Sequence, residues 1–288
     1  MNRQQILDRE QRGAQLAAYT ALAAAPLYIV SLFSLRGTGV PLTGLATEQL
    51  RAVDEVSGQV ILAGVLSALA LGLVTVPLYY LFRAAQARSA RVNPAMVGFV
   101  FIGPLLLAVQ TVIKAIAQVQ LASDFVAQST AGGDIYTLLD DLIDDSAMNQ
   151  VGSYLILPAL LAMVVAMIYV PLNAMRVGLL TRFFATLGMA LAASLILLQP
   201  QLSLLALMIW YAWLGLLILD RVPRGRPPAW AAGEAIPGPR PGQEPRPAVA
   251  AEATVEGDAT EAFSEPAAAQ DHSARRERAK KRKRKRRR

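Results

Sequence analysis

The stretch LSLLALMIWYAWLGLLIL, residues 202–219, contains eighteen residues and no charged side chain. A segment of this kind is long enough to be a membrane-spanning helix, because about 20 helical residues cross the hydrocarbon core of a bilayer. Helices suit lipid because they satisfy their backbone hydrogen bonds internally. Five further apolar stretches precede this one along the chain. The sequence therefore predicts an all-α, polytopic membrane protein with six transmembrane helices, near residues 14–34, 57–82, 97–120, 152–174, 179–198 and 202–219.

The overall composition agrees with a membrane protein. Hydrophobic residues make up 54% of the 288 residues and charged residues only 17%, against about 25% in soluble domains. The chain has no cysteine, and its single histidine, His272, lies outside the spans. Zinc sites built from His and Cys are therefore excluded, and so are Ser–His or Cys–His catalytic pairs within the spans. We expect neither an enzyme nor a cofactor.

The arginines of the short connections predict the orientation, because cytoplasmic connections of membrane proteins carry an excess of Lys and Arg. Four regions on one side of a six-span topology hold most of them, whereas the loops on the opposite side hold only Arg36 and Arg51. The sequence thus predicts a multi-pass protein of the plasma (inner) membrane with both termini in the cytoplasm. The arginines that carry this prediction are Arg3, Arg9, Arg12, Arg83, Arg88, Arg91, Arg176, Arg182, Arg221, Arg224 and Arg226.

The composition changes abruptly after Asp220. The following residues are rich in Pro, Ala, Gly and Glu and offer almost nothing to bury, so we expect a disordered cytoplasmic extension. Trp230 either rests at the headgroup boundary or is an ordinary residue of this extension. The expected parts of the chain are a cytoplasmic leader (1–13), a six-helix transmembrane domain (14–220), a disordered linker (221–274) and a polybasic tail (275–288).

The polybasic tail contains twelve Lys or Arg residues and one acid, whereas the other 274 residues hold sixteen bases and twenty acids. It therefore attracts anionic phospholipid headgroups, by about 1 kcal/mol for each base near the surface, or RNA such as ribosomal RNA through counterion release. Acidic protein segments are a third class of partner, and a role in topology or solubility alone is the remaining alternative. The residues expected to bind are Lys280, Lys281, Arg282, Lys283, Arg284, Lys285, Arg286, Arg287 and Arg288.

Lys114 is the only charged residue deep inside an expected span. Gln110, Lys114 and Gln118 recur every four residues, so they are expected to form one polar stripe on the third helix. An ionisable residue within a membrane is a candidate for contact with a ligand, an ion or a lipid. The alternative is that Lys114 extends its long side chain to the outer boundary, or that the stripe joins two helices.

A run of carboxylates marks the outer loop between the third and fourth spans. Two i, i+4 pairs lie there on a short amphipathic helix. Carboxylate oxygens are ligands for Ca²⁺ or Mg²⁺, but the ligand order and the central glycine of an EF-hand are missing. A solvated acidic helix on the outer leaflet is the other interpretation, so we assign no metal site. The candidate residues are Asp140, Asp141, Asp144 and Asp145.

The second span carries a row of small residues, Gly64, Ala68 and Gly72, spaced four residues apart. Small residues at this spacing let two membrane helices approach closely. We therefore expect this row to pack against another helix, within the chain or between two chains.

Two stretches, AMRVGLLTRFFATLG (174–188) and RGRPPAWAAGEAIP (224–237), are followed by the Lys/Arg-rich tail. Together they resemble uncharacterised multi-pass membrane proteins of actinobacteria that have six spans and a Lys/Arg-rich C-terminus. The resemblance implies a bacterial plasma membrane, in agreement with the excess of 23 Arg over 5 Lys. It brings no activity and no catalytic residue.

The sequence alone does not identify a molecular function. We expect a non-enzymatic interaction protein that is embedded in the lipid bilayer and whose tail binds anionic lipid or RNA near the membrane. The alternative is a transporter of small solutes or lipids that uses the polar stripe of the third helix. The oligomeric state stays open.

Overall fold

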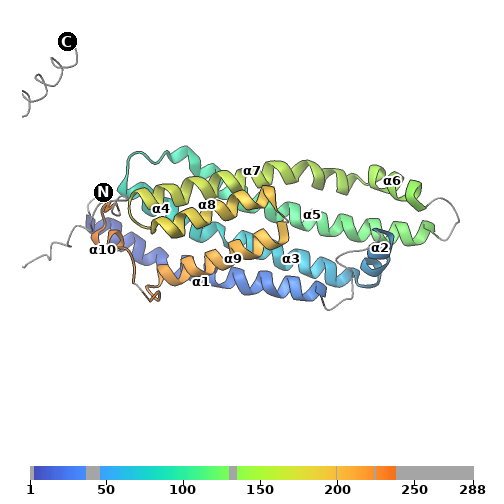
Figure 1. Cartoon of the computed structure of the whole chain (residues 1–288), viewed down its shortest axis with the longest axis horizontal. Helices are drawn as coiled ribbons and strands as arrows, with labels where there is room; N and C mark the ends of the chain where they lie inside the picture. The colour runs from blue at the N-terminus through green and yellow to red at the C-terminus, as the bar shows by residue number, and fades with distance from the viewer. Residues whose placement is uncertain (1–2, 37–45, 130–134, 199, 224, 238–288) are drawn as a thin grey trace, which may run out of the picture. The chain divides into compact units, whose positions relative to one another are not determined.

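Long α-helices run side by side in the computed structural model (Figure 1). The structure describes residues 3–36, 46–129, 135–198, 200–223 and 225–237, all within one unit of the chain, Met1–Gln243. These residues form helices and connections, with no β-strand among them. The all-α fold class is therefore confirmed for the described part of the chain.

The helices follow the expected apolar stretches and extend beyond several of them. Three are 30 or more residues long: α1 (Arg3–Arg36), α5 (Val97–Ser129) and α7 (Ala147–Arg176). Ser146 and Thr181 cap the starts of α7 and α8, since each side chain accepts a hydrogen bond from the backbone N–H three residues later. The other elements are α2 (Ala46–Glu55), α3 (Ser57–Leu73), α4 (Thr75–Arg88), the 3₁₀ turn η1 (Pro94–Met96), α6 (Ile135–Asp145), α8 (Arg182–Leu197), α9 (Pro200–Ile218) and α10 (Ala229–Ala232).

Five segments are long and apolar enough to cross a membrane: Arg3–Leu35, Ser57–Arg88, Pro94–Ser129, Ala147–Arg176 and Gln201–Ile218. The remaining expected span coincides with α8, an apolar helix of 16 residues. At 1.5 Å per residue it is about 24 Å long, shorter than the roughly 30 Å of a bilayer's hydrocarbon core. Several helices able to span a membrane are thus present, whereas the count of six stays a prediction.

The second expected span is divided into α3 and α4 at Val74. Pro77 explains the position of the break, because proline has no backbone N–H with which to bond the carbonyl of Leu73, four residues earlier. The prolines at 26, 104, 158 and 171 lie inside helices that continue past them. Helix interruption at proline is therefore confined to one of the spans in the described residues.

The helices form a closed ring of neighbours. In this ring α1 contacts α3, α3 contacts α5, α5 contacts α7, α7 contacts α8, α8 contacts α9, and α9 contacts α1. The helix α4 also contacts α1, α5, α7 and α9. Side chains fill the space between them, and the largest fully buried ones include Phe82, Met163, Met167 and Tyr211. The middle of the bundle is thus a packed core.

Glycines allow two of the closest helix contacts. A Cβ at Gly103 of α5 would lie 2.7 Å from the Cα of Met163 in α7, so a larger residue would push the helices apart. Gly64 of α3 packs against Ala115 of α5 in the same way. The row of small residues on the second span therefore packs within the chain at Gly64, whereas a Cβ at Gly72 would meet nothing within 4 Å.

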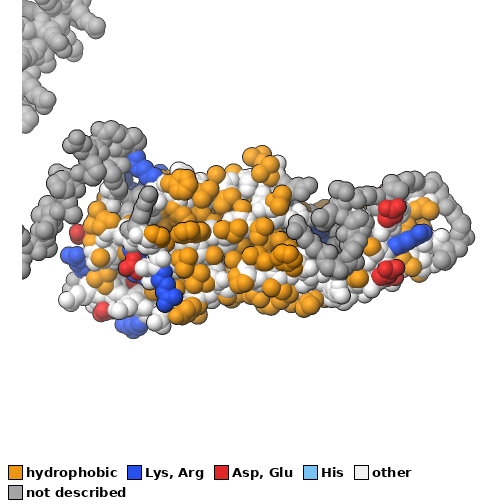
Figure 2. All heavy atoms as spheres, turned by 60° about the horizontal axis from the view of Figure 1, so that its bottom comes forward, with side chains coloured by type: hydrophobic (Ala, Val, Ile, Leu, Met, Phe, Trp, Pro, Cys, Tyr) orange, Lys and Arg blue, Asp and Glu red, His pale blue; other side chains and the backbone are white. Residues whose placement is uncertain are grey.

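The two ends of the bundle differ in charge. We call one end of the bundle the basic end. Residues 225–237 meet four parts of the chain there: the start of α1, the end of α4, the connection from α7 to α8, and the end of α9. We call distal end the end at which α2 and α6 pack on the far parts of α3 and α5 around Leu50, Val53 and Phe125. Figure 2 shows apolar side chains over the middle of one face, with charged side chains toward its ends.

Candidate functional site

Residues 225–237 form an ordered segment packed on the basic end, which we call the strap. The strap contains the short helix α10, which ends at Gly233, a C-cap with a left-handed φ of +65°. The prediction that the chain after Asp220 has almost nothing to bury is wrong here, because Ala229 and Trp230 are buried, Trp230 with only 5% of its surface exposed. The linker expected over 221–274 therefore does not begin at 221.

Trp230 is held by aromatic, cationic and hydrogen-bonding partners from α4, from the connection between α7 and α8, and from the strap itself. Its ring stacks on that of Tyr80 with 5.9 Å between centroids, and its indole N–H donates to the carbonyl of Leu179 at 2.9 Å. The guanidinium groups of Arg88 and Arg226 lie 5.8 and 5.7 Å from its ring centroid, which adds cation–π attraction. Of the two interpretations made from the sequence, neither a boundary anchor in lipid nor an ordinary linker residue describes these contacts.

A buried ion pair lies next to Trp230. Arg88 of α4 has a side chain that is 0% exposed and forms a two-pronged ion pair with the carboxylate of Glu10 in α1. The same guanidinium donates to the carbonyl of Ala229 in the strap at 3.1 and 3.2 Å. Arg88 therefore joins α1, α4 and the strap, and its charge is neutralised by Glu10 rather than available to a ligand.

The far part of the strap docks on the turn after α7. The N–H of Ile236 donates to the carbonyl of Val177 at 3.1 Å. Gly178, with φ of +81°, permits this contact, because any Cβ there would collide with the carbonyl oxygen of Ile236. At the other end of the strap, the N–H of Arg226 donates to the carboxylate of Asp220 at 2.9 Å. The strap is thus tied to the bundle along its length.

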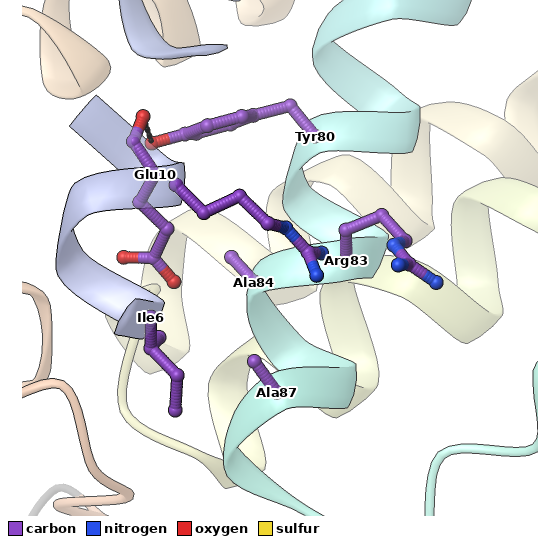
Figure 3. A pocket seen from close by; sticks show the side chains of 7 residues that line it. Ile6, Glu10, Tyr80, Arg83, Ala84 and Ala87 are labelled. Carbon is purple, nitrogen blue, oxygen red and sulfur yellow. Dashed lines mark hydrogen bonds between the residues drawn. The ribbon is translucent and has the colours of Figure 1, made fainter. Parts of the chain in front are cut away.

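A small hollow opens between α1 and α4 beside the ion pair (Figure 3). Its volume of about 40 Å³ corresponds to about three water molecules, well below the roughly 300 Å³ of a small-molecule site. Tyr80 crosses one side of it and donates its hydroxyl hydrogen to the carbonyl of Glu10 at 3.2 Å. The charged side chains that line it are Arg9, Glu10 and Arg83.

The structure does not bring the polar stripe to one environment. Gln110 is buried with 5% of its surface exposed, whereas Lys114 and Gln118 are exposed on the outside of the bundle. The reason is geometric: at 3.6 residues per turn, a step of four residues rotates by about 40°, so the stripe winds around α5. An interior path lined by all three residues is therefore absent from the described part of the chain.

The carboxylates of the outer loop lie on α6 at the distal end. Asp140, Asp141, Asp144 and Asp145 are all exposed, while Leu138, Leu139 and Leu142 pack toward the core at that end. Among the described residues, no three His, Cys, Asp or Glu side chains are grouped so that they could hold a metal ion. The candidate metal residues therefore form an exposed acidic face here.

The polybasic tail and residues 238–274 lie outside the described residues, so the lipid- or RNA-binding role of Lys280–Arg288 stays a prediction. The buried cluster of Glu10, Arg88 and Trp230 is the feature that sequence reasoning missed. Its one signal was a tryptophan in a stretch otherwise rich in Pro, Ala and Gly.

Comparison of the chain with protein-family models, with curated proteins and with solved structures finds no match. The resemblance to actinobacterial membrane proteins accordingly stays a prediction.

Proposed function

We propose that this chain is a six-span protein of a bacterial plasma membrane, with both termini in the cytoplasm, and that it acts as a non-enzymatic interaction protein. Its polybasic tail binds anionic phospholipid headgroups at the cytoplasmic surface. In this proposal α8 is the sixth span, paired with α9, which it contacts.

The gathering of arginines at the basic end supports the orientation. The four regions that the sequence assigns to the cytoplasm meet there through contacts between residues far apart in the chain, such as Arg88 with Ala229 and Trp230 with Leu179. Cytoplasmic ends of membrane proteins carry an excess of Lys and Arg. The distal end, with its exposed carboxylates on α6, is then the outer one.

The observation that carries the function is the charge of residues 275–288, twelve bases among fourteen residues, following a strap that is docked on the basic end. Residues 238–274, thirty-seven residues of the sequence, separate the strap from the tail. Lipid surfaces attract each nearby base by about 1 kcal/mol, an attraction that salt weakens.

A deletion of residues 275–288 tests this function. Full-length and tail-deleted proteins, reconstituted in phosphatidylcholine nanodiscs, are offered vesicles of phosphatidylglycerol or phosphatidylcholine. We expect phosphatidylglycerol vesicles to capture the full-length protein in a salt-sensitive way and the tail-deleted protein at least about tenfold less. The matched control deletes residues 247–260, also fourteen residues but without any base, and retains capture.

Two outcomes contradict the lipid proposal. If the deletion abolishes binding of ribosomes but leaves capture by phosphatidylglycerol vesicles unchanged, the partner of the tail is RNA. If the deletion changes neither, the tail is not a binding element.

A further inference from the structure

Exposed large apolar side chains are concentrated on α1, α3, α5, α7, α8 and α9, over the middle of the bundle, and we call them the apolar belt (Figure 2). On α1 they lie between Leu16 and Phe33, and on α7 between Val151 and Ile168. Each of these intervals is about 26 Å long at 1.5 Å per residue. The apolar belt is therefore about as high as α8 is long, and slightly lower than the roughly 30 Å of a typical hydrocarbon core.

The apolar belt ends far before the distal end on α5 and α7. The exposed large apolar residues of α5 end at Val109, and the next exposed residue of this helix is Lys114. A Cβ at Gly152 of α7 would lie 3.6 Å from the side chain of Ile113, so Lys114 is level with Val151, the last member of the belt on α7. The exposed residues of α5 beyond Lys114 are Gln118, Gln120, Ser123, Asp124, Ala127 and Gln128.

The hairpin of α8 and α9 stops near the same level, whereas α5 and α7 continue past it (Figure 1). The hydroxyl of Tyr28 donates to the carbonyl of Gln201 at 3.2 Å, so α9 begins about 12 Å before the end of α1. On α3 the belt reaches Ile61, three residues beyond Gly64, which packs against Ala115 of α5. The distal edge of the belt is therefore uneven by about one helical turn. The exposed apolar residues at the tip of the hairpin are Ile196, Leu197, Leu198 and Leu202.

Beyond the belt, the distal end has a core of its own and a charged exterior. The helix α5 continues from Lys114 to Ser129, about 22 Å. The apolar cluster around Phe125 holds α2 and α6 there and is separate from the main core. Charged side chains facing hydrocarbon are costly, so this exterior requires water. Its exposed charged residues on α2 and α6 are Glu48, Arg51, Glu55, Asp140, Asp141, Asp144 and Asp145.

We infer that lipid contacts only the apolar belt, that the hydrocarbon ends at the level of Lys114, and that the distal end is a small helical domain in the water outside the bilayer. The ammonium group of Lys114 then lies at the level of the headgroups, so the third span ends near residue 114 rather than 120. The 16 residues of α8 suffice as a span, because the embedded parts of α1 and α7 are about equally long. This inference rests on the membrane placement in the proposed function but not on the tail.

The chain contains no cysteine, so one introduced cysteine is the only thiol to label. Single-cysteine variants of the full-length protein are placed in phosphatidylcholine nanodiscs with a cysteine-free scaffold, where water reaches both faces, and are treated with a charged maleimide. We compare Gln118→Cys and Ser123→Cys with Ile102→Cys and Val109→Cys, four positions that are all exposed on α5. The last two should react at least about tenfold more slowly, because the thiolate is the reactive form and hydrocarbon disfavours it.

Two controls accompany the labelling. All four variants should react at one rate after denaturation in sodium dodecyl sulfate, which shows that each thiol is intact. Thermal unfolding should match that of the parent protein, because all four substitutions are on the surface. Leu105→Cys, also exposed on α5 within the belt, replaces Ile102→Cys or Val109→Cys if either unfolds.

The outcomes separate this inference from the proposed function. If Gln118→Cys is as protected as Val109→Cys, the hydrocarbon extends past Lys114 and the inference is wrong, while the six spans remain possible. If Ile102→Cys and Val109→Cys react as fast as Gln118→Cys, the belt is not in lipid, and the inference and the membrane placement both fail. If the expected difference is found but vesicle capture does not depend on residues 275–288, the inference holds and the tail function fails.

Discussion

The basic end and the distal end both carry charged side chains, but these charges have different surroundings. At the basic end, Arg88 is enclosed, paired with Glu10 and covered by the strap. At the distal end, the carboxylates of α6 are exposed, and that end is held together by an apolar cluster that includes Phe125. The comparison teaches that removing a charged side chain lowers stability mainly where that side chain is buried and paired.

The largest effect is expected from Arg88→Ala. Removing Arg88 leaves the carboxylate of Glu10, which is only 11% exposed, without its ion-pair partner, so the free energy of unfolding should fall by about 3–5 kcal/mol. Thermal or denaturant unfolding of the purified protein in detergent measures this. Arg91→Ala, an exposed arginine of the same end, should change stability by no more than about 0.5 kcal/mol. Equal stability of the two variants would mean that the ion pair does not hold the basic end together.

Much of the fold could be predicted from the sequence, because continuous apolar stretches determine helices in lipid without reference to the rest of the chain. The packing role of Gly64 was visible for the same reason, since small residues at four-residue spacing are a local signal. The strap was not predictable. Trp230 gains its partners Tyr80 and Leu179 only after folding, from positions far away in the sequence.

The candidate sites show the same limit. The spacing of Gln110, Lys114 and Gln118 placed all three on one helix, but it did not show that Gln110 faces the bundle while Lys114 and Gln118 are exposed. The sequence also marked Arg88 only as a sign of orientation, because its partner Glu10 lies 78 residues earlier. Local patterns thus predict elements, whereas burial of a polar group depends on which elements meet.

An intermediate effect is expected from Phe125→Ala at the distal end. Phe125 is fully buried in the apolar cluster there, and truncating such a side chain costs about 3–5 kcal/mol when the surroundings cannot collapse. Because α2 and α6 are short and peripheral, we expect the lower part of this range. Hydrogen exchange should increase in residues 46–55 and 135–145, while the backbone N–H of Ile236 in the strap keeps its protection.

Phe99→Ala is the matched control for Phe125→Ala, because Phe99 lies on the same helix but is 40% exposed. It should leave exchange in α2 and α6 nearly unchanged. If Phe125→Ala instead increases exchange in the strap as much as in α2 and α6, the two ends unfold together. Their stabilities are then not independent, and the contrast between the two ends fails.

The smallest effect is expected from the double variant Asp140→Asn, Asp144→Asn. The two carboxylates are exposed one helical turn apart, where like charges repel by about 0.2–0.5 kcal/mol, so neutralising them should stabilise α6 slightly or not at all. Thermal unfolding with a chelator or with millimolar Ca²⁺ or Mg²⁺ separates this from a metal site. A midpoint that rises with Ca²⁺ or Mg²⁺ in the parent protein but not in the variant would show that these carboxylates bind the ion together. Both ends would then be stabilised by neutralised charges. The ends would differ in what neutralises the charge: a buried side chain at the basic end and a bound metal ion at the distal end.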